Sequence, residues 1–208
     1  MLMLVLASVL MPACQSVTTR PPSSYIASYQ DFPPEPGQFQ VCHDMGCEGL
    51  TEVSLEAADW HRLRQLFSPQ AQSASAEREQ IRRAVALFER ITGPLAKTHN
   101  DVSRNAAGPS LADRQLDCVA ETVNTTTYLL LFQQQGWLRW HQVGFPQHRG
   151  LFSLLGPHNT AVIVEEASGQ RYVVDTWFHN NGALPETVPS QLWAAGYDPA
   201  ESKWSNQQ

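Results

Sequence analysis

Three residues in the second half of the 208-residue chain carry the side chains that a thiol enzyme uses: Cys118, His158 and Asp175. Cys118 opens a long, mostly apolar run, 119–132, that stops at Gly136 and predicts a buried helix with the cysteine in its first turn. Unpaired N–H groups and the positive end of the helix dipole favour a thiolate there. The sequence therefore predicts a nucleophilic cysteine; the alternative is a small buried apolar residue.

A predicted β-hairpin supplies the histidine and the carboxylate. His158 begins the strand 158–165, and Asp175 lies at the end of the strand 170–177, with Ser168-Gly169 as the turn between them. Antiparallel pairing brings both side chains to the same open end of the sheet. A nucleophilic cysteine needs a base within hydrogen-bond reach and a third group to orient that base. We expect the cysteine to meet this pair if its helix packs across the sheet.

Other histidines compete for the role of the base. His141, His148 and His179 lie in the same half of the chain as His158. A histidine at a strand end is also commonly a partly exposed surface residue, and Asp175 has an alternative role as a turn cap. The residues alone leave these alternatives open.

The order of a helix-start cysteine, a strand histidine and an aspartate at the end of the next strand resembles the transglutaminase-like branch of the papain-type cysteine enzymes. The segment 158–177 looks like that family's histidine strand, turn and aspartate strand, and the resemblance covers residues 110–178. It implies an α+β fold with a buried helix packed on an antiparallel sheet. It also implies Cys118 as nucleophile, His158 as general base and acid, and Asp175 as the residue that holds the imidazole tautomer.

The resemblance implies acyl transfer from an amide through a thioester, with a peptide, a protein or a cell-wall amide as substrate. Hydrolysis would make the chain a peptidase or amidase, and an attacking amine would make it a transamidase. No metal or organic cofactor is expected. The oxyanion would meet the Cys118 backbone N–H and a second donor, for which Gln115 and Asn124 are candidates. Asp117 would raise the thiol pKa unless it serves as the helix cap.

The N-terminal region predicts export and lipid anchoring. Residues 1–13 carry no charge and contain an apolar run that is too short to span a bilayer but suits a secretion signal. The following Cys14 resembles the lipid-modified cysteine of bacterial lipoproteins, and Gln15 after it favours the outer membrane. Residues 14–40 are polar and proline-rich, which predicts a flexible tether, and 41–208 are expected to form one domain.

The predicted roles of the other three cysteines leave Cys118 as an unpaired thiol. Cys42 and Cys47 lie five residues apart around a glycine, and this spacing predicts a small disulfide loop in an oxidising compartment. The alternative is a metal site that adds His43, but no second ligand pair accompanies it. With Cys14 lipidated and the other two paired, Cys118 is left as an unpaired thiol outside the cytoplasm.

The rest of the chain is expected to pack around the central helix. The pattern predicts an amphipathic helix over 55–67 and a second that begins after Ser75 and ends at Gly93-Pro94. It also predicts a strand over 137–143, followed by an irregular segment, and a C-terminal segment 178–208 that wraps the core.

The charge of the chain argues against nucleic acid as a partner. The net charge is −6, with 14 Lys and Arg residues and no basic cluster, so binding to nucleic acid is not expected. Contact with a membrane is expected through the lipid anchor only. The rival to an enzyme is a non-catalytic envelope lipoprotein that binds a protein or a cell-wall partner.

Overall fold

The apolar run after Asp117 forms helix α4, Cys118–Gln134, at the centre of the molecule. Asp117 caps it, because its Oδ1 accepts the N–H groups of Val119 at 3.1 Å and Ala120 at 2.9 Å. Gly136, with a φ of 68°, follows the end of the helix. The predicted helix and the predicted place of the cysteine in its first turn are confirmed.

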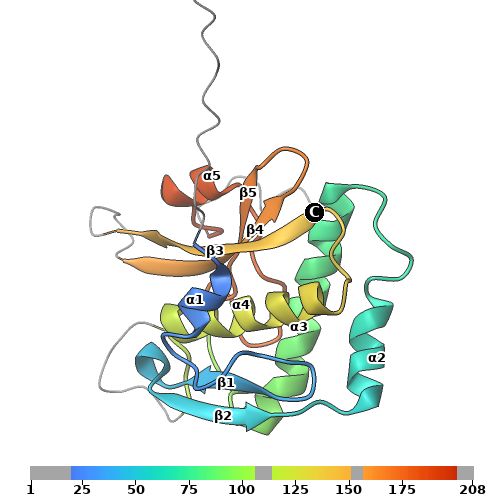
Figure 1. Cartoon of the computed structure of the whole chain (residues 1–208). Helices are drawn as coiled ribbons and strands as arrows, with labels where there is room; N and C mark the ends of the chain where they lie inside the picture. The colour runs from blue at the N-terminus through green and yellow to red at the C-terminus, as the bar shows by residue number, and fades with distance from the viewer. Residues whose placement is uncertain (1–19, 106–113, 151–156, 201–208) are drawn as a thin grey trace, which may run out of the picture.

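A computed structural model describes residues 20–105, 114–150 and 157–200, and these form the predicted α+β fold with two antiparallel sheets (Figure 1). The elements in chain order are α1 Pro22–Ile26, β1 Phe39–His43, the 3₁₀ turn η1 Met45–Cys47, β2 Gly49–Val53, α2 Ala57–Gln65, α3 Ala74–Ala96, α4, β3 His141–Arg149, β4 His158–Glu165, β5 Arg171–Val174 and α5 Ser190–Ala194.

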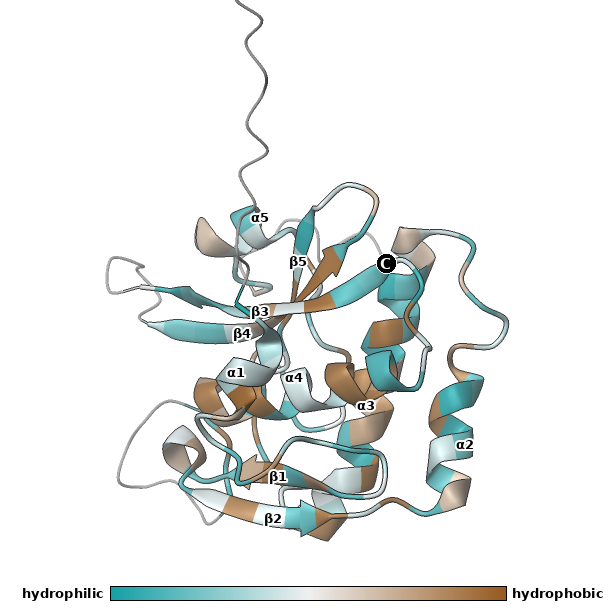
Figure 2. Ribbon diagram, viewed as in Figure 1, coloured by the Kyte–Doolittle hydropathy of each residue, from teal (hydrophilic) through white to brown (hydrophobic). Residues whose placement is uncertain are grey.

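Helix α4 lies between the two sheets. The hairpin β1–β2 packs on one side of it and the sheet β3–β4–β5 on the other, with α3 crossing behind and α5 on the far face of the larger sheet (Figure 1). Apolar residues gather where these elements meet (Figure 2). A helix covered on both sides needs no polar face, which explains why its apolar residues lack a one-sided pattern.

The larger sheet agrees with the predicted hairpin and corrects the strand before it. Strand β4 has the predicted bounds, and Gly169, with a φ of 69°, supplies the turn to β5. Strand β5 is shorter than the predicted 170–177, because it ends at Val174, and Asp175 follows it directly. Strand β3 begins at His141 instead of 137, since the Glu77 carboxylate takes the N–H groups that lead into it. It also continues to Arg149, where an irregular segment was expected. A register shift between Gly144 and Gln147 accommodates the proline that lies between them.

The predicted tether, residues 14–40, is longer than the structure allows. From Arg20 to Gln40 the chain belongs to the folded domain: Ile26 is 1 % exposed, and the Gln30 amide donates to the Gln40 carbonyl at 2.9 Å and to Thr127 Oγ1 at 3.0 Å. Composition suggested a linker, but the packing of a few apolar side chains decides the conformation here. Residues 14–19, with the predicted lipid site Cys14, lie outside the described residues.

The boundaries of the first two long helices also differ from the prediction. Helix α3 starts earlier because Ser73, not Ser75, accepts the Ala76 N–H. It runs through Gly93-Pro94 and ends at Ala96, and the capping residue Lys97 has a φ of 62°. The helix was expected to end at Gly93-Pro94. Instead, Gly93 packs closely against Asn181 and His99, and its carbonyl accepts the Thr98 N–H at 2.8 Å. Helix α2 begins two residues later and ends two residues earlier than the predicted 55–67.

The C-terminal segment was predicted to wrap the core, and its described part, up to residue 200, packs over β5. Val173, Phe178 and Trp193 form a buried cluster there, and Trp193 comes from α5. None of the helices among the described residues is long and apolar enough to cross a bilayer. The described C-terminal residues therefore add a layer behind the sheet end that holds the predicted site.

Candidate active site

His158 and Asp175 meet at the open end of the hairpin, as predicted. The Nε2 atom of His158 donates to Oδ2 of Asp175 at 2.8 Å, and both residues are 2 % exposed. The indole Nε1 of Trp193 donates to the same carboxylate oxygen at 2.7 Å. Two donors on one buried oxygen hold the carboxylate in place. Trp193 was not predicted as part of the site.

The imidazole lies in an aromatic enclosure. Its ring centroid is 4.5 Å from that of Trp177, 5.4 Å from Trp193 and 5.6 Å from Phe178. The Nδ1 atom is buried and has no hydrogen-bond partner among the described residues. Because Nε2 carries the proton directed at Asp175, a neutral His158 has its lone pair on Nδ1. The bond to Asp175 is the one that an orienting carboxylate makes to a general base.

Cys118 is a free, half-buried thiol at the start of α4. Its Sγ lies 4.0 Å from the Nδ2 atom of Asn159, the residue after His158 on β4. Side chains alternate along a strand, so Asn159 points to the sulfur while its neighbour points to the aromatic rings. The structure thus brings the cysteine to the strand end that carries the base, but the sulfur faces Asn159 and not the imidazole, and within the described residues the thiol and the imidazole are not hydrogen-bonded.

The thiol pKa differs from the expectation. Burial raises the pKa of Cys118 above its usual value, and the charges of Asp117 and Asp175 raise it further, while the Asn159 amides lower it. Asp117 does cap the helix, yet the cap does not cancel the effect of its charge on the thiol. The resting site holds a neutral thiol instead of the predicted thiolate, so a base is needed to activate it.

The competing histidines are engaged elsewhere, with one exception. His141 Nδ1 bonds Glu77 at 2.9 Å, and His179 Nε2 bonds Glu186 at 2.8 Å. His148 lies beside the site: its Nδ1 donates to Oδ1 of Asn159 at 2.9 Å.

Neither predicted second oxyanion donor is available. The Gln115 amide donates to the Asn100 carbonyl at 3.1 Å, and its oxygen accepts from Val102 and Asn105. The Asn124 amide bonds both backbone groups of Cys42, at 2.7 Å and 2.9 Å. Both side chains hold the fold around α4. Both were chosen as candidates because they lie near Cys118 in the sequence, which does not show which groups they bind in the fold.

The small disulfide loop braces the start of α4. Cys42 and Cys47 are joined as predicted, with their Cα atoms 4.9 Å apart. The Gly46 N–H donates to Oδ2 of Asp117 at 2.9 Å, so the loop binds the residue that caps the helix. The alternative metal site at these cysteines is excluded by the disulfide, and the described parts of the chain contain no cluster of His, Cys, Asp and Glu that could hold a metal ion.

A group of buried carboxyls lies behind the site. The Thr176 hydroxyl donates to Oε2 of Glu121 at 2.6 Å, and burial together with Glu89 and Asp101 raises the pKa of Glu121 well above its usual range. Burial also raises the pKa of Glu89 to about 8 and that of Asp101 to about 6. The sequence signal for this group is a glutamate inside an apolar run.

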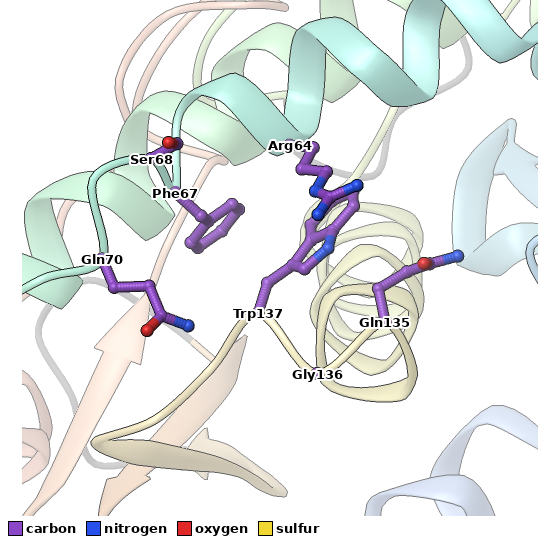
Figure 3. Close-up of a pocket in the computed structure, with 7 residues that line it drawn as sticks. All are labelled: Arg64, Phe67, Ser68, Gln70, Gln135, Gly136 and Trp137. Carbon is purple, nitrogen blue, oxygen red and sulfur yellow. The ribbon is translucent and has the colours of Figure 1, made fainter.

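Two cavities flank the ends of α4. The one beside the candidate site has a volume of about 240 Å³. Its walls include Tyr25, Tyr29 and Phe145, and it reaches His148 and Asn159. A larger one, about 470 Å³, lies at the opposite end of the helix, away from Cys118. Figure 3 shows its lining residues: Arg64, Phe67, Ser68, Gln70, Gln135, Gly136 and Trp137.

Comparison with known proteins adds no assignment to this geometry. No protein-family model, curated protein or solved structure matches the chain.

Proposed function

We propose that the chain is a thiol acyl-transfer enzyme of the transglutaminase-like kind, acting on an amide as a peptidase, an amidase or a transamidase. The observation that carries this proposal is the buried bond between His158 and Asp175, which leaves Nδ1 of the imidazole with no partner among the described residues, on the strand whose next residue, Asn159, contacts a free cysteine at a helix start. A buried histidine held by a carboxylate is the base and orienter pair that thiol and serine enzymes share.

In the first step, the Cys118 thiol gives its proton to Nδ1 of His158 as the sulfur attacks the amide carbonyl. The resulting tetrahedral intermediate collapses when the imidazolium returns the proton to the leaving amine, and a thioester remains on Cys118. Water or a second amine then attacks the thioester, and the thiol is regenerated. Asp175 keeps its hydrogen bond to Nε2 throughout and stabilises the imidazolium. The sulfur and Nδ1 are not in contact at rest, so this step requires a side-chain movement that brings them together, as catalytic hydrogen bonds that are long in a substrate-free enzyme tighten when substrate binds.

The proposal can be tested with an activated ester, without knowledge of the natural substrate. Wild-type protein should release one equivalent of 4-nitrophenolate per chain from 4-nitrophenyl acetate and carry an acetyl group on Cys118 by mass spectrometry. Cys118→Ser should abolish the burst, and His158→Ala should slow it by at least about 100-fold. The control His61→Ala removes an exposed histidine of α2 and should have no effect. Acetylation of Cys118 at the same rate in the wild type and His158→Ala would remove the base from the mechanism.

We also propose that the enzyme acts in the bacterial envelope, held by a lipid on Cys14, with the outer membrane favoured. The uncharged apolar N-terminus before Cys14 supports this, as does the Cys42–Cys47 disulfide, because such bonds persist in oxidising compartments. Cells grown with labelled palmitate should label the wild type and not Cys14→Ala. Equal labelling of both would reject the anchor.

A second candidate is a non-catalytic envelope lipoprotein that binds a protein or a cell-wall partner. The observation that favours it is the raised pKa of the Cys118 thiol, together with the lack of a hydrogen bond to His158. The two functions differ in the reactivity of the sulfur. Alkylation of Cys118 by iodoacetamide in the native protein at neutral pH supports the enzyme, and a thiol that reacts only after denaturation supports the binding protein.

A further inference from the structure

The side chain of Asn159 is placed as a donor aimed at the reacting sulfur. Its Nδ2 lies 4.0 Å from Sγ of Cys118, while its Oδ1 accepts the Nδ1 proton of His148 at 2.9 Å. The second bond fixes which end of the amide faces the cysteine, because an oxygen turned toward the sulfur would leave the His148 N–H facing an NH₂ group.

An oxyanion forms close to this donor when the sulfur attacks a carbonyl. In the tetrahedral intermediate the negative oxygen lies two bonds from the sulfur. A donor 4.0 Å from Sγ can therefore meet that oxygen at the distance of about 3 Å that an oxyanion contact needs. Asp117 takes the N–H groups of Val119 and Ala120 and not that of Cys118 itself, so the cysteine's own N–H can serve as the other donor.

The cavity beside Asn159 offers room for the acyl group. It has a volume of about 240 Å³, and the rings of Tyr25, Tyr29 and Phe145 line it. The Tyr25 and Phe145 rings meet edge to face, with their centroids 5.8 Å apart. Aromatic walls of this kind favour an apolar or aromatic group next to the scissile bond.

We propose that the Asn159 amide is the second donor of the oxyanion hole, that His148 positions it, and that the adjoining cavity receives an apolar or aromatic acyl group. The proposal rests on the thiol acyl-transfer function proposed above. Asn159 forms no covalent bond and exchanges no proton; it stabilises charge that exists only in the transition state and the intermediate.

The test compares two reactions of the same sulfur. Acylation by 4-nitrophenyl acetate passes through an oxyanion, and alkylation by iodoacetamide does not. Both reactions use the thiolate, so the ratio of their rate constants at one pH does not depend on the fraction of thiolate. The ratio therefore measures stabilisation of the oxyanion and not the thiol pKa. Asn159→Ala should lower this ratio by about 100-fold, the usual effect of deleting one such donor. His148→Ala should lower it less, because the amide remains but is no longer held.

Two further variants make the result decisive. Asn159→Val removes the amide and keeps a strand-favouring residue, in case alanine unfolds the strand end. Gln142→Ala deletes an exposed amide elsewhere in the same sheet and should leave the ratio unchanged.

Three outcomes would overturn the proposal. An unchanged ratio in both Asn159 variants would remove the donor role. A fall in Tyr25→Phe without a fall in the Asn159 variants would assign the role to the Tyr25 hydroxyl, which is buried without a partner among the described residues. A wild type that is alkylated by iodoacetamide and never acylated at Cys118 would overturn the proposed function together with this inference, so the two failures are distinguishable.

Discussion

Replacing Glu89 by glutamine should change how the stability of the fold depends on pH. Glu89 is 6 % exposed on α3; its Oε2 accepts the Gly182 N–H at 2.7 Å, and its Oε1 has no hydrogen-bond partner within the described part of the chain. Burial, with a smaller contribution from the charge of the nearby Asp101, raises its pKa from an ordinary 4.5 to about 8. The side chain is therefore protonated in the folded protein at neutral pH.

The sign of the effect follows from proton binding. Between pH 4.5 and about 8 the folded state keeps the Glu89 proton and the unfolded state releases it. Stability is therefore complete below about pH 4.5 and falls as the pH rises toward 8. A difference of about 3.5 in pKa, at about 1.4 kcal/mol for each unit, sets an upper limit of about 5 kcal/mol. Neighbouring carboxyls share the titration, so we expect a loss of at least about 2 kcal/mol.

Urea unfolding at several pH values between 5 and 9 measures this loss. The free energy of unfolding should fall with pH in the wild type and fall much less in Glu89→Gln, so the variant should be the more stable protein at pH 9. Glu166→Gln, an exposed glutamate in the turn after β4, is the control and should follow the wild type. Equal slopes for wild type and Glu89→Gln would refute the reasoning, because Glu89 would then be ionised in the fold.

Three other changes test the site and its supports. Trp193→Phe removes the indole N–H that donates to the Asp175 carboxylate at 2.7 Å. A hydrogen bond to a charged group contributes about 1.5 to 3 kcal/mol, so its loss should slow acetylation of Cys118 by roughly 10- to 100-fold. An unchanged burst rate would show that the indole only packs. The double change of Cys42 and Cys47 to serine opens a short loop and should cost about 2 kcal/mol in urea unfolding, an expectation that fails if reduction leaves the wild-type curve unchanged. Glu77→Gln disturbs a carboxylate that accepts three backbone N–H groups and a histidine; we expect a loss of about 3 kcal/mol by the same measurement, and a loss below about 1 kcal/mol would contradict it.

The sequence alone determined the features that depend on local pattern. The apolar run after Asp117 specified a buried helix with Cys118 in its first turn, since a long apolar segment that begins at a capping residue has few other conformations. The alternation around the Ser168-Gly169 turn specified a hairpin, and antiparallel pairing then placed His158 and Asp175 at one end of it. The spacing of Cys42 and Cys47 specified their disulfide.

Only the tertiary structure decided what surrounds these residues. The Trp193 donor comes from a separate helix, 18 residues after the carboxylate it binds, and no local pattern announces such a contact. Composition suggested a tether through Gln40, yet the burial of Ile26 makes that segment part of the domain. The thiol pKa depends on burial and on charges brought together by folding, so a helix start by itself predicted the wrong direction for Cys118. Asn159 reaches the sulfur because the start of α4 packs against the start of β4. Such packing between segments distant in sequence is set by the whole fold, whereas the periodicity of apolar residues within one segment is local.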